Sequence, residues 1–169
     1  VNLWFTKIIG INTTDVSATA TAVVGFVSTV NPGNLLPIAI GRDSYPLFST
    51  YNSEANPISL YSVYHTPNDD QAAQWTSFLT DENNVPVIRD FMTNGNPTTL
   101  SIGEDIWIEP GTKTTIFSSV PTNVDVVLPV VYVAPGGTIS THTEMKIVGF
   151  IGFHIISSTG KSTKDITGY

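Results

Sequence analysis

The residues of this chain best suited to acid–base or metal chemistry are its three histidines. His142 and Glu144 stand two positions apart, so on a β-strand both would lie on one face, as two metal ligands would. His65 and His154 belong to no recognised ligand spacing. A solvated strand edge explains His142 and Glu144 as well, and a histidine on an apolar strand, such as His154, is typical of a hydrogen-bonded core residue. We therefore interpret the histidines as structural and expect no catalytic residue.

Clusters of acidic and amide side chains suggest a second chemistry, because Ca²⁺ prefers oxygen ligands. The candidate calcium ligands are Asp69, Asp70, Asp81 and Glu82. The stretch that begins at Asp81 departs from the EF-hand pattern, since Val85 and Pro86 stand at its fifth and sixth positions. Helix starts and turn caps account for the same acidic residues. We expect neither a cofactor nor a metal, and Ca²⁺ is the alternative.

Motifs for phosphate binding and nucleophilic catalysis fail on spacing. Residues 159–162 resemble the end of a phosphate-binding loop, but Ile155 stands where that loop requires a glycine. The chain has no G-x-S-x-G elbow, and no pair of carboxylates has a context typical of a glycosidase. The sequence therefore predicts a protein that is not an enzyme. An extracellular hydrolase, with a histidine near a carboxylate in a cleft, is the least favoured alternative.

Aromatic side chains offer a third chemistry, the stacking of sugar rings on an exposed platform. The residues considered for this are Trp4, Trp75, Trp107, Tyr45, Tyr51, Tyr61, Tyr64 and Tyr132. Trp75 has helical spacing with Phe78 and Leu79, and Trp107 lies between two isoleucines. Both contexts favour packing in a core over a binding platform.

The composition indicates what kind of scaffold must position these residues. The chain has 169 residues, 41% of them hydrophobic and only 12% charged, which suits one β-rich exported domain spanning residues 1–169. The net charge of −7 and the seven scattered lysines and arginines argue against nucleic acid and anionic membranes as partners. The absence of cysteine excludes disulfides and thiolate metal sites. No apolar run is long enough for a membrane helix.

Period-two alternation predicts that the chain begins with β-strands. In residues 11–27, small or apolar side chains alternate with serine and threonine, which places one set on a buried strand face. We expect strands over residues 1–11 and 15–30, and a turn at 31–34 built on Pro32 and Gly33.

Further along the chain, the pattern predicts more strands and two short helices. Helical spacing of apolar residues, with aspartates at the start, predicts a helix over 69–80. Pro86 near the start and Gly95 at the end bound a second helix over 84–94. Short apolar runs or strands are expected at 35–40, 45–51, 58–65, 101–109, 112–117, 124–134 and 145–156, the last a central strand that is apolar on both faces. The expected fold is mainly β (α+β), an antiparallel β-sandwich-like domain with two short helices.

Five segments, taken in order, resemble the C-terminal region of the TadG-like (Flp pilus-assembly TadE/TadG-like) proteins of bacterial tight-adherence systems. They are residues 11–22 (INTTDVSATATA), 72–78 (AAQWTSF), 102–115 (IGEDIWIEPGTKTT), 124–131 (VDVVLPVV) and 147–155 (IVGFIGFHI), and the closing 164–169 (KDITGY) is similar to the family's end. The resemblance implies a cell-surface, extracellular or periplasmic protein without enzymatic activity, tied to pilus assembly or adhesion. The family's N-terminal membrane anchor is missing from this sequence.

A protein of this kind acts by binding other proteins of the envelope or pilus machinery, or copies of itself. The N-terminal apolar residues are the interface candidates, because a strand at a chain end can pair with the open edge of a neighbour's sheet. They are Trp4, Phe5, Ile8, Ile9 and Ile11. The alternative function is a secreted carbohydrate-binding or adhesin module that uses exposed tyrosines and Ca²⁺-holding loops.

Overall fold

The computed structural model describes residues 27–51, 53–82 and 84–169. The strands expected before residue 27 and the interface candidates Trp4, Phe5, Ile8, Ile9 and Ile11 lie outside these residues. Of the strand expected over 15–30, the described part contains β1 at Thr29–Val30. Among the described residues, no helix has the length and apolar character needed to span a membrane.

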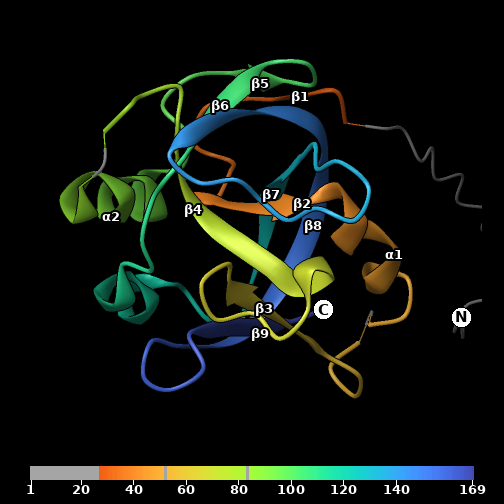
Figure 1. The fold of residues 1–169 in the computed structure, drawn as a ribbon. Helices are drawn as coiled ribbons and strands as arrows, with labels where there is room; N and C mark the ends of the chain where they lie inside the picture. The colour runs from red at the N-terminus through yellow and green to blue at the C-terminus, as the bar shows by residue number, and fades with distance from the viewer. Residues whose placement is uncertain (1–26, 52, 83) are drawn as a thin grey trace, which may run out of the picture.

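The described chain is mainly β with a few short helices, which confirms the expected fold class (Figure 1). The strands are β1 Thr29–Val30, β2 Ile38–Gly41, β3 Ile58–Ser62, β4 Ala72–Phe78, β5 Leu100–Ser101, β6 Asp105–Ile108, β7 Val124–Val131, β8 Thr143–Thr159 and β9 Asp165–Gly168. The α-helices are α1 Tyr45–Phe48 and α2 Val85–Asn94, and short 3₁₀ turns are η2 Arg42–Ser44, η3 Asp69–Gln71 and η4 Thr114–Ser119.

The principal sheet closes on itself. Its strand order is β2-β7-β8-β6-β4-β3-β9, and two additional pairings, β2 with β4 and β8 with β9, join parts of the sheet that this order leaves apart. Most pairs are antiparallel, whereas β2 with β7 and β3 with β4 are parallel. Figure 1 shows β8 as a long blue ribbon that arches from the top of the view down to β3 and β9. The small sheet of β1 and β5 lies at the top, beside β6.

The helix predicted over residues 69–80 is wrong, because most of this stretch is strand β4. All seven residues of β4 are buried, including Gln74, Thr76 and Ser77. A strand that is covered on both faces shows no period-two alternation, and its apolar residues then fall at helical spacing by chance. The acidic start forms only the short turn η3, at Asp69–Gln71.

The second predicted helix is confirmed as α2. The side chain of Asn84 accepts a hydrogen bond from the backbone N–H of Val87 at 2.8 Å, and Pro86 lies in the first turn. Gly95 ends the helix with a φ of 73°, a conformation that favours glycine. The buried face of α2 consists of Ile88, Phe91 and Met92.

Two short stretches differ from the expected extended structure. Residues 45–51 contain the helix α1, and residues 112–117 lead into the 3₁₀ turn η4. Ile116 and Phe117 are adjacent and both buried in the core. Neighbouring residues of a strand point to opposite faces, whereas a helical turn allows both side chains to enter the same apolar cluster. Lys113, with a φ of 46°, makes the bend that starts this turn.

The core consists of two apolar clusters. One is centred on Ile38, Trp75 and Phe117, and the other on Phe78 and Phe91. The Trp75 and Phe117 rings meet edge to face, with centroids 5.0 Å apart. Trp75 is thus a packing residue, as its sequence context predicted, although it lies on a strand.

Candidate functional site

The three histidines lie on separate elements. His65 follows β3, and its Nδ1 is 3.4 Å from Thr112 Oγ1. His142 is exposed just before β8, where its ring meets the ring of Trp107 edge to face at 5.6 Å. His154 lies within β8, and its Nδ1 is 2.7 Å from a carboxylate oxygen of Asp125. Each imidazole therefore contacts a residue of its local surroundings, and the structure does not gather them into one site.

The candidate calcium ligands lie at opposite ends of β4. Asp69 and Asp70 precede the strand in η3, whereas Asp81 and Glu82 follow it. A seven-residue strand spans roughly 20 Å, which is too far for the two pairs to share one ion. Among the described residues, no three histidine, aspartate or glutamate side chains are placed to hold a metal ion together.

A buried polar cluster under the 109–113 loop was not predicted from the sequence. Glu109 is fully buried and pairs with Lys113 Nζ at 3.2 Å. Gln74 Nε2 donates to the carbonyl oxygens of Glu109 and Gly111, and Trp75 Nε1 donates to that of Thr112 at 2.8 Å. These bonds fix the loop against β4. The available signal was a glutamate directly after the apolar strand β6, with a lysine four residues later across a Pro-Gly turn.

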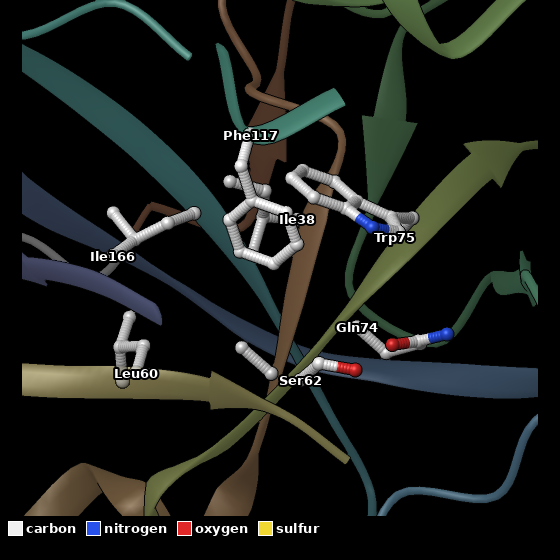
Figure 2. A pocket seen from close by; sticks show the side chains of 8 residues that line it. Ile38, Leu60, Ser62, Gln74, Trp75, Phe117 and Ile166 are labelled. Atoms are coloured by element: carbon white, nitrogen blue, oxygen red, sulfur yellow. The ribbon is translucent and has the colours of Figure 1, made fainter. Parts of the chain in front are cut away.

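The cavity inside the sheet is too small for a metabolite. It is lined by Ile38, Leu60, Ser62, Ala73, Gln74, Trp75, Phe117 and Ile166, and its volume is about 10 Å³. Figure 2 shows the polar ends of Ser62 and Gln74 near each other, away from the apolar residues. Ser62 Oγ and Gln74 Oε1 are buried and have no hydrogen-bond partner among the described residues. This space suits about one water molecule.

The aromatic residues do not form one platform among the described residues. Trp75 is buried. Tyr64 is exposed, but its hydroxyl accepts a hydrogen bond from the Gly111 N–H at 3.0 Å and lies 2.9 Å from Thr141 Oγ1. Tyr132 is also exposed, and its ring lies under the Arg42 guanidinium at 5.2 Å. Tyr64 therefore links two loops, whereas Tyr132 lines an open depression.

The most distinctive feature for recognition is the edge of β8. On one side, β8 pairs with β7 from Ile147 to Ile155. On its other side, it pairs with β6 at residues 143–146 and with β9 at residues 155–159. Within the described part of the chain, no strand pairs with this second side between those two stretches. The strand expected to be central therefore pairs with one neighbour along most of its length, and it has neighbours on both sides only near residues 146–147 and 154–155, where these stretches meet.

The hydrogen bonds show which main-chain groups face this gap. At one end, Ile147 exchanges hydrogen bonds with Gly103 and Glu104, and at the other end His154 exchanges them with Tyr169. Residues of an antiparallel strand alternate between its two neighbours, so Phe150 and Gly152 face the same side as His154. The pairing with β7 leads to the same conclusion. Val127 stands opposite Gly152, and its carbonyl oxygen accepts a hydrogen bond from the Leu36 N–H on the side of β7 away from β8. The main-chain groups of Gly152 therefore point away from β7 as well. Pro129, which has no N–H, stands opposite Phe150.

An apolar groove lies beside the open part of β8. It has a volume of about 290 Å³ and is lined by Val27, Arg42, Ile102, Val130, Val148, Gly149 and Phe150. Val27 is 54% exposed and Ile102 is 43% exposed, which is high for large apolar side chains. We define the recognition edge as the Phe150 and Gly152 main chain together with this groove. Unpaired strand groups beside apolar pockets are what an added strand requires.

No protein-family model matches this chain, and comparisons with curated proteins and solved structures found no match. Its role must therefore be argued from its own residues and geometry. The recognition edge has the main-chain and side-chain chemistry that suits the addition of an extended strand.

Proposed function

We propose that this chain is a structural or assembly protein of the bacterial cell surface, without enzymatic activity, tied to Flp/Tad-type pilus assembly or adhesion. It acts by binding other polypeptides, and it self-assembles into extracellular filaments. The observation that carries the proposal is the recognition edge, where Phe150 and Gly152 present main-chain groups that pair with no other strand in the described part of the chain, beside an exposed apolar groove. Such an edge gains affinity from main-chain hydrogen bonds and specificity from side-chain pockets.

The resemblance to the TadG-like proteins agrees with this proposal. Four of the five resembling segments fall in the described residues: three contain β4, β6 and β7, and the fourth, 147–155, lies within β8. These strands surround the recognition edge or support it from the far side of the sheet. The resemblance therefore involves the part of the fold on which the proposed binding depends.

The chemistry-bearing side chains serve the fold in ways that support a role without catalysis. The Glu109–Lys113 pair and Gln74 hold a loop, and His154 pairs with Asp125 on neighbouring strands. The proposed location is extracellular or at the cell surface, with the periplasm as a second compartment. The partners are envelope or pilus proteins and further copies of the chain.

The test is the oligomeric state of the full chain in solution. We expect light scattering to give a mass that rises with protein concentration and negative-stain microscopy to show oligomers or filaments. If the chain binds an envelope protein but does not associate with itself, the proposed role in assembly stands and the proposed self-assembly into filaments is contradicted. A mass of about 18.2 kDa at every concentration, with no capture of envelope proteins, would contradict the proposal.

A second candidate function is suggested by the open depression that contains Tyr132. It has a volume of about 610 Å³, and Tyr132, Glu144 and Lys146 are among its lining residues. An exposed ring beside charged groups suits a glycan. A carbohydrate-binding module would show a higher melting temperature with its glycan, because a ligand of the native state stabilises it. A further rise with Ca²⁺ that EDTA removes would favour the calcium-dependent form.

A further inference from the structure

We propose that the polypeptide bound at the recognition edge is residues 16–26 of a second copy of this chain, added to β8 as a strand. This inference rests on the proposed self-assembly and goes beyond it by naming the partner segment. The described domain supplies the acceptor, and the N-terminal segment of the neighbouring copy supplies the donor.

The acceptor defines the length and pattern of the strand that it can take. The gap extends from Ile147, which is capped by Gly103 and Glu104, to His154, which is capped by Tyr169. The six residues between them, 148–153, span about 20 Å. An incoming strand therefore needs about six residues, with apolar side chains toward the groove and hydrogen-bonding groups toward Phe150 and Gly152.

The segment 16–26 has the required pattern. Its small or apolar residues Val16, Ala18, Ala20, Ala22, Val24 and Phe26 alternate with Ser17, Thr19, Thr21, Val23 and Gly25. One face of such a strand is apolar and suits the groove, while much of the other face carries hydroxyl groups suited to water. The segment contains no charged residue, so its insertion beside Val148 and Phe150 buries no unpaired charge.

The chain enters the fold beside the groove. Val27 lines the groove, the carbonyl of Ser28 accepts a hydrogen bond from the Ile102 N–H at 2.9 Å, and Thr29–Val30 pairs with β5. Twenty-six residues reach at most about 86 Å when extended, roughly four times the length of the gap. A donor of this length is suited to bridging two copies.

The arrangement predicts the geometry of the assembly. Donor segment and acceptor edge are different patches of one chain, so each copy binds the next head to tail. Such heterologous contacts give an open filament unless the rotation between copies happens to close a ring. The resulting polymer has one unfilled edge at one end and one free donor segment at the other.

The decisive variant is Gly152→Pro, and its matched control is Gly152→Ala. A Cβ added at Gly152 meets no atom within 4 Å, so the alanine control has space. Proline removes the N–H that faces the gap and places its ring there, whereas the N–H toward β7 belongs to neighbouring residues and stays. We expect the concentration needed for assembly to rise about tenfold or more in Gly152→Pro and to stay as in the wild type in Gly152→Ala. Circular dichroism checks that both variants fold.

A mixing experiment tests whether the strand comes from a second copy. Gly152→Pro retains its donor segment, and Val24→Lys retains its acceptor edge while placing a charge on the apolar face of the donor. At a protein concentration at which the wild type assembles, we expect each full-length variant to stay monomeric alone. We expect the mixture of the two variants to give one-to-one dimers. In the wild-type assembly, we expect slow hydrogen exchange at the amides of Phe150 and Gly152.

The outcomes separate the two proposals. A wild-type chain that never self-associates overturns both this inference and self-assembly. If the wild type assembles and Gly152→Pro assembles equally well, or if the amides of Phe150 and Gly152 exchange fast in the assembly, self-assembly stands and the recognition edge is not its contact. If those amides already exchange slowly in a monomer and the mixture gives no dimer, the segment fills the gap of its own chain. The proposal that a second copy supplies the strand is then refuted.

Discussion

Replacement of Asn96 should destabilise the domain much more than replacement of the nearby, exposed Asn94. Asn96 is 1% exposed and follows α2. Its Oδ1 accepts hydrogen bonds from the backbone N–H groups of Asn34 and Leu35, at 3.0 and 2.9 Å. Its Nδ2 donates to the carbonyl oxygens of Asn31 and Thr98, at 3.1 and 2.6 Å. One side chain thus ties the turn after β1 to the chain after α2.

The magnitude follows from these four bonds. A net contribution of about 1 kcal/mol per bond would give about 4 kcal/mol, and water can replace some of the bonds near the exposed Asn34. We therefore expect Asn96→Ala to lower the free energy of unfolding by about 3 kcal/mol. For a domain of this size the melting temperature should fall by roughly 6–12 °C. Asn96→Asp keeps the acceptor but turns a second oxygen toward the carbonyls of Asn31 and Thr98, so it should be destabilised similarly at neutral pH.

Urea unfolding followed by tryptophan fluorescence measures these changes. The matched control is Asn94→Ala, because Asn94 is exposed and donates to Asp90 on the same helix at 2.8 Å. This control should cost about 0.5 kcal/mol or less. A loss below about 1 kcal/mol in Asn96→Ala, or an equal loss in the two variants, would refute the reasoning that the four buried bonds act together.

Two further pairs of variants test the packing of turns and charges. Gly95→Ala should lower the free energy of unfolding by about 3 kcal/mol or more, because the added Cβ would lie 2.5 Å from the backbone of Gly33. The control is Gly111→Ala, which has a similar positive φ but open space around the added Cβ and should cost about 1 kcal/mol. Thermal unfolding compares the two, and equal losses would mean that the close approach is unimportant. Lys113→Met should cost about 3–5 kcal/mol in urea unfolding, because it leaves the buried Glu109 carboxylate without its cation, whereas the exposed Lys161→Met should change little. A tolerated Lys113→Met would show that the pair is not needed for stability.

Local signals explain the parts of the fold that could be predicted. Helix α2 begins and ends where Asn84, Pro86 and Gly95 place it, because capping and turn preferences depend on neighbouring residues alone. The turn at Pro32 and Gly33 is likewise present, with a φ of 83° at Gly33. In both cases the chemistry that decides the structure lies within a few residues of the chain.

Distant contacts explain what could not be predicted. Strand β4 is buried on both faces by segments far away in the sequence, so its own pattern resembled a helix. Distant segments also determine where the middle of β8 stays open. Residues 145–156 are apolar on both faces, which predicts burial, but only the positions of β6 and β9 determine where one edge stays unpaired. The candidate site of the sequence analysis, at residues 4–11, lies outside the described residues, whereas the recognition edge required the three-dimensional arrangement.

The position of β9 has a consequence for when the molecule can fold. Asp165–Gly168 pairs with β3 on one side and β8 on the other, and the bonded hydroxyls of Ser59 and Thr167 are 108 positions apart in the chain. Pairings over such distances form late, because a long loop must close first. While the chain is being synthesised, the closure of the sheet through β3, β9 and β8 cannot form before Asp165–Gly168 emerges. If the protein is exported as proposed, this part of the sheet stays open until Asp165–Gly168 has crossed the membrane.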